Sequence, residues 1–218
     1  MYRILSLAVG FCVSVAAQAD AYGVFEMPGQ TRTEVYYQDD NHIRVSASQQ
    51  GYMLVSGDKV YSIMNQGGKK VAMDMGQMGK AMAQFSQGGN RSEDNTPGNV
   101  EIRKTGRTET VAGYEGHVHE VSIDGRTLEV VLTDHPRVVA ATQGVLKAMV
   151  RAGQMLDPEN SGNTRKMLKD LDETGYGGTL RQKDGLTLVE AKEVDKPDSF
   201  YQLPSDAEMM SMPGMPGQ

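Results

Sequence analysis

The stretch TVAGYEGHVHEVSIDGRTLEVVLTD, residues 110–134, decides the fold that we expect for this chain. At its centre lies Asp124-Gly125, a pair that accepts the positive φ angles of a tight two-residue hairpin turn. A turn at this point predicts two antiparallel strands, and counting outward from it predicts their register. The expected partners are Ile123 with Arg126, Val121 with Leu128, His119 with Val130, and His117 with Leu132.

The hairpin predicts one apolar face and one wetter face, because successive side chains of a strand point to opposite sides. The apolar face is expected to hold His117, His119, Val121, Ile123, Leu128, Val130 and Leu132. The wetter face is expected to hold Val118, Glu120, Ser122, Thr127, Glu129 and Val131. Two histidines would then lie among apolar side chains, where desolvation disfavours a charged imidazole.

Short alternating runs separated by turn residues predict further strands on both sides of this hairpin. The turns are marked by Gly57-Asp58, Gln66-Gly67-Gly68 and Asp184-Gly185. A succession of such hairpins makes an antiparallel sheet. The strands expected outside the central hairpin are 31–37, 43–47, 52–56, 59–64, 71–73, 100–104, 108–111, 179–183 and 186–194.

Three segments have the three-to-four-residue apolar spacing of amphipathic helices. The first runs from Met75 to Phe85 and can be capped by Asp74. The second begins near Pro136 and is expected to end at Gly153, and a third covers residues 163–172. The apolar stripes of the first two helices are Met75, Met78, Met82 and Phe85, and then Val138, Thr142, Val145 and Met149.

These elements predict an α+β fold with a single domain from residue 22 to residue 204. A long antiparallel sheet curls, and helices bury their apolar stripes on one of its faces. We therefore expect a strongly curved antiparallel β half-barrel with a few amphipathic helices packed on its concave face. The last segment, residues 205–218, has a methionine-rich, low-complexity sequence and is expected to be disordered.

Four segments resemble an uncharacterised exported bacterial family, a domain of unknown function related to the LolA and LolB carriers of outer-membrane lipoproteins. They are EVYYQDDNHIRV (34–45), YMLVSGDKVYSIMNQGGKKVAMDM (52–75), KTGRTETVAGYEGHVHEVSIDG (104–125) and DSFYQLPSD (198–206). The resemblance extends roughly from Gly23 to Pro204 and follows the order and spacing of these segments. It implies the fold of the carriers, an open β half-barrel closed by helices over an apolar cavity.

The first 21 residues have the regions of an export signal. A short basic region precedes an apolar run from Ile4 to Ala17, and cleavage is equally compatible with the positions after Ala19 and after Ala21. The single cysteine, Cys12, lies inside this segment, so the mature chain is expected to contain no disulfide. No later run is apolar enough to span a membrane. These features indicate a periplasmic protein.

Composition and motifs argue against two classes of function. The net charge of −6 and the lack of a basic patch argue against a nucleic-acid partner. The mature chain has no cysteine nucleophile, and neither G-x-S-x-G nor H-E-x-x-H occurs, so we expect no enzymatic activity and no cofactor. Glu120 and Glu129 face each other across the predicted hairpin, where they could form a paired-carboxylate site or could both point into water.

Two groups of residues could bind a metal. His117 and His119 have the His-x-His spacing that places two imidazoles on one face of a strand, but the sequence identifies no third ligand for them. Thioethers are soft ligands suited to copper(I). The methionine-rich tail offers four of them, at Met209, Met210, Met212 and Met215.

The function that we expect is the binding of a lipid acyl chain or another apolar ligand in the half-barrel cavity, without catalysis. The expected lining combines the hairpin with the helix stripes: His117, His119, Val121, Val130, Leu132, Met78, Met82, Val145 and Met149. Two alternatives stay open at this point, a periplasmic copper- or other metal-binding protein and a protein-interaction module without a ligand. The sequence indicates no particular protein partner.

Overall fold

A computed structural model describes residues 19–29, 31–48, 51–85, 100–123, 125–156 and 177–210 of the chain. The expected export signal up to residue 18, the predicted third helix at 163–172 and the tail residues Met212 and Met215 lie outside these ranges. Within the described ranges, no helix combines the length and the apolar character needed to cross a membrane.

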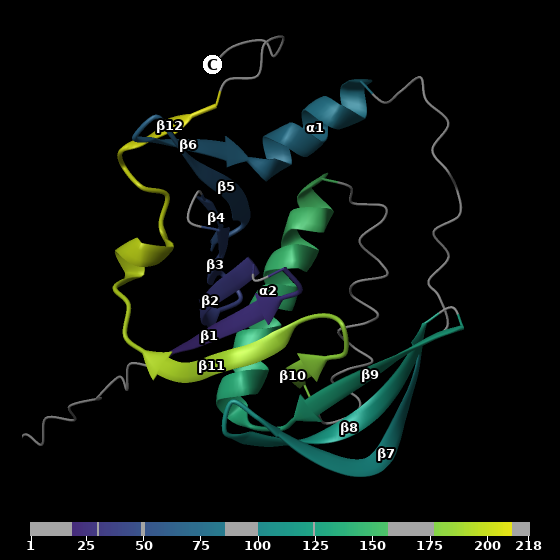
Figure 1. Cartoon of the computed structure of the whole chain (residues 1–218). Helices are drawn as coiled ribbons and strands as arrows, with labels where there is room; N and C mark the ends of the chain where they lie inside the picture. Colours follow the sequence, from purple (N-terminus) through teal and green to yellow (C-terminus); the bar gives the residue numbers. More distant parts are fainter. Residues whose placement is uncertain are drawn as a thin grey trace, which may run out of the picture.

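In this part of the chain twelve strands form one sheet, and two α-helices accompany it (Figure 1). The α+β class expected from the sequence is confirmed. The strands are β1 (Asp20–Met27), β2 (Thr31–Asp39), β3 (His42–Ser48), β4 (Gly51–Ser56), β5 (Lys59–Gln66), β6 (Lys69–Asp74), β7 (Val100–Val111), β8 (Tyr114–Ile123), β9 (Arg126–Thr133), β10 (Gly178–Gln182), β11 (Thr187–Val194) and β12 (Ala207–Met209). The helices are α1 (Met75–Phe85), α2 (Pro136–Leu156) and a short 3₁₀ helix, η1 (Asp198–Tyr201).

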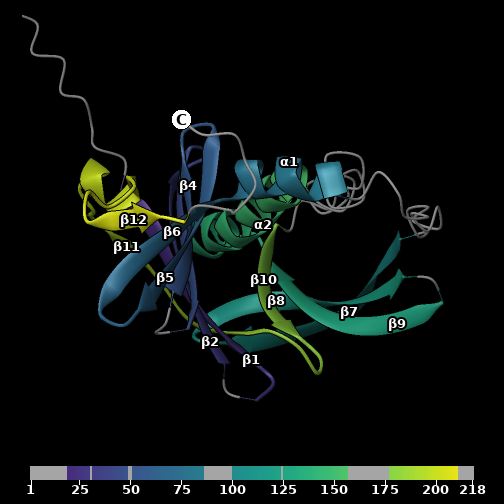
Figure 2. The same cartoon turned by 90° about the horizontal axis from the view of Figure 1, so that it is seen from above.

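The sheet runs in the order β12-β6-β5-β4-β3-β2-β1-β11-β10-β9-β8-β7. Neighbouring strands are antiparallel except for β12, which pairs in parallel with β6. The pairing of β1 with β11 therefore joins the meander β1–β6 to the strands β7–β11. Figure 2 shows that the sheet bends, so that α2 lies between the β2–β6 part and the β7–β10 part.

The register predicted from the Asp124-Gly125 turn is confirmed. Strands β8 and β9 pair with His117 opposite Leu132 and His119 opposite Val130. Gly125 has a φ of +78°, the left-handed conformation for which glycine suits this turn. A local sequence signal was sufficient here because the turn alone fixes which residues face each other.

The predicted division of the hairpin into an apolar and a wetter face is correct only in part. His119 and Leu132 are buried as expected, with 3% and 1% of their surface exposed. Val118 and Val131, assigned to the wetter face, are also buried and belong to the main core together with Leu180 of β10. Residues on both faces are therefore buried at the base of the hairpin, where β10 pairs with β9 and contributes Leu180 to the same core cluster.

Strand β1 lacks the alternating pattern by which the other strands can be recognised. Asp20 to Phe25 are all buried, so neither face of this strand is polar.

Two element boundaries differ from those expected from the sequence. The predicted strands 100–104 and 108–111 form one strand, β7, whose register shifts between Lys104 and Thr108 around Gly106 (φ +80°). Helix α2 continues past Gly153 to Leu156, and Gly153 does not adopt the positive φ of a helix-terminating glycine.

Helix α2 reaches its place because two glycines let it approach β1 and β2 closely. A Cβ atom on Gly23 would lie 2.6 Å from the Cβ of Ala141, and one on Gly144 would lie 2.8 Å from the Cβ of Tyr37. Real Cβ atoms do not approach other atoms this closely. The seating of the helix on the sheet therefore depends on the absence of both side chains.

Helix α1 begins where the sequence predicts and docks on the end of α2. The Asp74 carboxylate accepts hydrogen bonds from the backbone N–H groups of Gly76 (2.9 Å) and Gln77 (3.1 Å), so the predicted cap is confirmed. A Cβ on Gly79 would lie 2.0 Å from the backbone carbonyl oxygen of Met155. The glycine that weakens α1 as an isolated helix is therefore the residue that permits its contact with α2.

The segment 195–210, called the C-terminal strap here, crosses the face of the sheet opposite α2 (Figure 1). The strap contains η1, and within the tail that was expected to be disordered from residue 205, Ala207–Met209 form β12. The strap carries an apolar side into the outer face of the sheet, where Leu203 and Ala207 pack against the buried cluster of Leu54 and Tyr61. This long-range burial orders a segment whose own composition predicts no structure.

Two polar contacts fix the ends of the strap. The buried hydroxyl of Tyr201 donates a hydrogen bond to the carboxylate of Asp20 at 2.6 Å, and burial raises the pKa of this phenol. At the other end the Lys70 ammonium contacts the Asp206 carboxylate at 2.9 Å. The strap therefore links β1, near the middle of the sheet, to β6 at its edge.

A matched pair of glycine substitutions on α2 tests the seating of the helix. Gly144→Ala should destabilise the protein by about 1–3 kcal/mol, because the added methyl group overpacks the contact with Tyr37. Gly153→Ala has open space around the new Cβ and should stabilise the helix by roughly 0.5–1 kcal/mol. Urea unfolding monitored by circular dichroism measures both changes. An equal effect of the two substitutions would show that close packing at Gly144 does not control stability.

Candidate binding pockets

An apolar pocket of about 540 Å³ lies on the inner face of the sheet, where the C-terminal half of α2 passes β3, β4 and β5. Its walls are formed mainly by aliphatic and methionine side chains, of which Met27 and Met149 are 38% and 48% exposed. Methionine side chains are flexible and adapt to irregular apolar shapes. The residues that define the inner pocket are Met27, Val45, Met53, Met64, Val145 and Met149.

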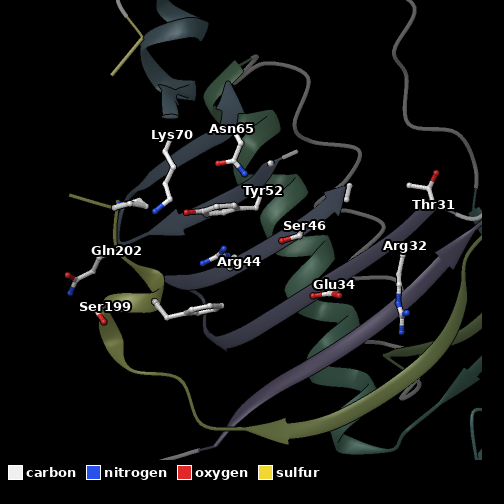
Figure 3. Close-up of a pocket in the computed structure, with 14 residues that line it drawn as sticks. Thr31, Arg32, Glu34, Arg44, Ser46, Tyr52, Asn65, Lys70, Ser199 and Gln202 are labelled. Atoms are coloured by element: carbon white, nitrogen blue, oxygen red, sulfur yellow. The ribbon is translucent and has the colours of Figure 1, made fainter. Parts of the chain in front are cut away.

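A second pocket, of about 900 Å³, lies on the outer face of the sheet, between strands β2–β6 and the C-terminal strap (Figure 3). Its lining is polar and includes Arg32, Glu34, Arg44, Asn65 and Lys70. The outer and inner pockets share Ala47, Gly51, Tyr52 and Asn65, so they meet where β3 and β5 end and β4 begins.

Arg44 is held between two aromatic rings in the outer pocket. Its guanidinium carbon lies 3.7 Å from the ring centre of Tyr52 and 4.4 Å from that of Phe200. Phe200 also contacts the ring of Tyr36 edge-on, with the ring centres 4.9 Å apart. These contacts hold the guanidinium beside the two rings through cation–π interactions. Arg44 lies in the strand expected at residues 43–47, and the sequence contains no signal that Phe200 returns across that strand.

The residues predicted to line a single cavity lie in different parts of the structure. Val145 and Met149 lie in the inner pocket as expected. Met78 and Met82 are on α1, where Met82 is 53% exposed, and neither lines that pocket. His119, Val121, Val130 and Leu132 belong to the β8–β9 hairpin, and none of them lines the inner pocket either.

His117 lines a smaller cleft of about 370 Å³ at the base of the hairpin, together with Tyr114 and His135. The rings of Tyr114 and His135 meet edge-on with their centres 4.6 Å apart. In the part of the chain that the structure describes, no three side chains among histidine, cysteine, aspartate and glutamate gather in a way that could hold a metal ion. The pair His117 and His119 thus acquires no third ligand of these types there.

Glu120 and Glu129 lie opposite each other in the hairpin, as the register predicts. Each carboxylate contacts arginine: Glu120 pairs with Arg103, and Glu129 pairs with Arg107 and with Arg181 at 2.8 Å. Hydrogen bonds from Arg181 and then Arg107 lower the pKa of Glu129 to about 2. Glu129 is therefore an ionised carboxylate that pairs with two arginines. It does not share a proton with Glu120, and it does not simply point into water.

Of the four tail methionines, the structure describes Met209 and Met210. Met209 ends β12 and is 45% exposed, and the backbone N–H of Met210 donates to the carbonyl of Ala72 at 2.8 Å. Met212 and Met215 lie outside the described ranges. The copper(I) hypothesis for these four residues stays a prediction.

Comparisons with known proteins add only distant structural likenesses. No family model matches the chain, and no curated protein matches it. Among solved structures, the chain is similar to PNGF-II, with a TM-score of 0.37 and 11% sequence identity. The match covers 88% of this chain and 31% of that chain, so this chain spans less than a third of the length of PNGF-II. A likeness at this level supports no assignment of fold or function.

His119 gives a prediction for pH dependence. Desolvation by burial lowers the pKa of its imidazole below the usual value, although its Nδ1 lies 2.9 Å from the backbone oxygen of His117. Stability should therefore fall as the pH drops from about 6.5 towards the lower folded pKa, because in this window the unfolded chain binds a proton that the folded chain does not. NMR titration of the histidine ring signals, assigned with His119→Gln, measures the pKa. A value above 6.5 would contradict the burial argument.

Proposed function

We propose that this protein binds an apolar ligand, such as a lipid acyl chain, in the inner pocket beside α2, and that it does so without catalysis. The observation that supports this most directly is the apolar lining of a pocket of about 540 Å³. Pockets for small molecules commonly have volumes of about 300–1,000 Å³ and mostly apolar walls. The exposed methionines Met27 and Met149 would adapt to a flexible chain, because thioether side chains change shape at little cost.

The curvature of the sheet supports a more specific proposal about the fold. We propose that the bent antiparallel sheet with α2 inside its curve is a half-barrel of the kind found in the LolA and LolB carriers. In such a half-barrel the helix occupies most of the concave face, and a ligand takes the space that the helix leaves. The inner pocket lies beside Val145 and Met149, in the C-terminal half of α2, which agrees with this arrangement.

We also propose that the chain is exported to the periplasm, with cleavage after Ala19. Cleavage there would leave β1 complete, from Asp20. Cleavage after Ala21 would remove Asp20, whose buried carboxylate accepts the hydrogen bond of Tyr201, and Ala21, which is 7% exposed. The burial of these two residues favours the earlier of the two positions.

The export proposal has a direct test. The full chain would be expressed in a bacterium with a periplasm, and the mass and first residues of the protein in the periplasmic fraction would be determined. We expect the mature protein to begin at Asp20. A protein beginning at Tyr22 would refute the choice of site, and one that keeps Met1 and stays in the cytoplasm would refute export.

Ligand binding is tested with a neutral apolar fluorophore, N-phenyl-1-naphthylamine, and a matched pair of substitutions. Met149→Glu places a charge in the wall of the inner pocket and should weaken binding at least about tenfold, or ~1.4 kcal/mol, because a charge is poorly tolerated in apolar surroundings. Gln143→Glu adds the same charge to α2 at a residue that does not line the pocket, and it should leave binding unchanged.

Fluorescence titration gives the dissociation constants, and thermal melting shows whether the variants fold. Met149 is 48% exposed, so its replacement should have little effect on the melting temperature. Failure of the wild-type protein to bind the fluorophore, or equal weakening by both substitutions, would argue against the inner pocket as the ligand site.

A further inference from the structure

Arg44 differs from the other half-buried arginines that the structure describes. Arg181 donates to the carboxylates of Glu109 and Glu129, and Arg151 donates to the carbonyl of Gly57. The guanidinium of Arg44 packs against the rings of Tyr52 and Phe200. Within the described residues, no carboxylate or carbonyl accepts a hydrogen bond from it. The chain therefore orients this cation between two rings without supplying an acceptor for its N–H groups.

The side chains around Arg44 favour a polar ligand with a negative charge. Arg32 and Lys70 also line the outer pocket, and Glu34 is the one acid among the described lining residues. Figure 3 shows Lys70, Tyr52 and Arg44 on neighbouring parts of the same face of the sheet, with Ser46 close to Arg44. Lys70 is partly neutralised by Asp206 of the strap, so Arg44 is the cation best placed to receive a ligand's charge.

We infer that the outer pocket binds a polar small molecule through a carboxylate group that Arg44 receives at the edge of its guanidinium. Arginine presents N–H groups in a planar fork that matches the two oxygens of a carboxylate. Because the rings of Tyr52 and Phe200 pack against the guanidinium, its edge is the part that we expect to be open to an acceptor. A carboxylate can accept from two of these N–H groups in one plane.

The rest of the pocket would hold the uncharged part of such a ligand. A volume of about 900 Å³ is far larger than a carboxylate needs, and Ser46, Asn65 and Gln202 offer hydroxyl and amide groups for hydrogen bonds. These groups suit hydroxyl-bearing or amide-bearing compounds, such as a sugar acid, better than an acyl chain. The site is thus distinct in chemistry from the inner pocket, which lies on the opposite face of the sheet.

The test uses sodium glucuronate as the carboxylate probe and glucose as its neutral counterpart. NMR spectra of ¹⁵N-labelled protein follow the side-chain Nε–H signal of Arg44, identified by its absence in Arg44→Lys. We expect glucuronate to shift this signal in a saturable manner and glucose to leave it in place. Calorimetry should show that Arg44→Lys weakens glucuronate binding about tenfold or more, since lysine keeps the charge but loses the fork.

Arg126→Lys is the matched control, because Arg126 is exposed at the start of β9 and does not line the outer pocket. It should bind glucuronate like the wild-type protein. The inference is overturned if glucuronate does not shift the Arg44 signal, if glucose shifts it equally, if inorganic phosphate binds and glucuronate does not, or if both arginine variants lose binding alike. If Arg44→Lys folds poorly, the Arg44 signal is assigned in the wild-type protein by through-bond correlation to its backbone, and the shift by glucuronate remains the readout.

Discussion

The close approach of α2 to β1 and β2 is the contact on which the rest of the structure depends. Gly23 and Gly144 remove the two side chains that would hold the helix away from the sheet. With α2 in this position, small residues such as Ala141 and Ala148 fill the space between helix and strands, and the sheet bends around the helix. The inner pocket lies beside the same helix, further along it, where it passes β3–β5. The shape of the core and the position of the pocket thus follow from one helix–sheet contact.

Local signals in the sequence predicted local structure well. The Asp124-Gly125 turn fixed the pairing of β8 with β9, and Asp74 marked the start of α1. Structural features that depend on contacts between distant parts of the chain could not be predicted from local sequence patterns. Strand β1 is buried on both faces and so shows no alternation. Val131 is buried in the main core with Val118 and Leu180, on a side of the hairpin that its own sequence presents as wet.

For the candidate sites too, the sequence predicted local features but not contacts between distant parts of the chain. The helical stripe of α2 predicted Val145 and Met149 as pocket residues, because the face of a helix can be read from its spacing. The hairpin histidines were assigned to the same cavity, but the bend of the sheet carries them elsewhere. Arg44 was visible only as a polar residue on a strand. Its surroundings come from Phe200, which lies more than a hundred residues later and reaches it through the strap.

The sheet ends in two unlike edges, and the C-terminal strap explains the difference. An open edge strand is a template for pairing with another chain, and proteins protect such edges with charges and bulges. Strand β7 has both devices, with Arg103, Lys104 and Arg107 along it and a register shift around Gly106. Strand β6 is instead covered by β12, a strand of three residues at the end of the strap. Without β12, residues 70–72 of β6 would present free backbone groups to a second molecule.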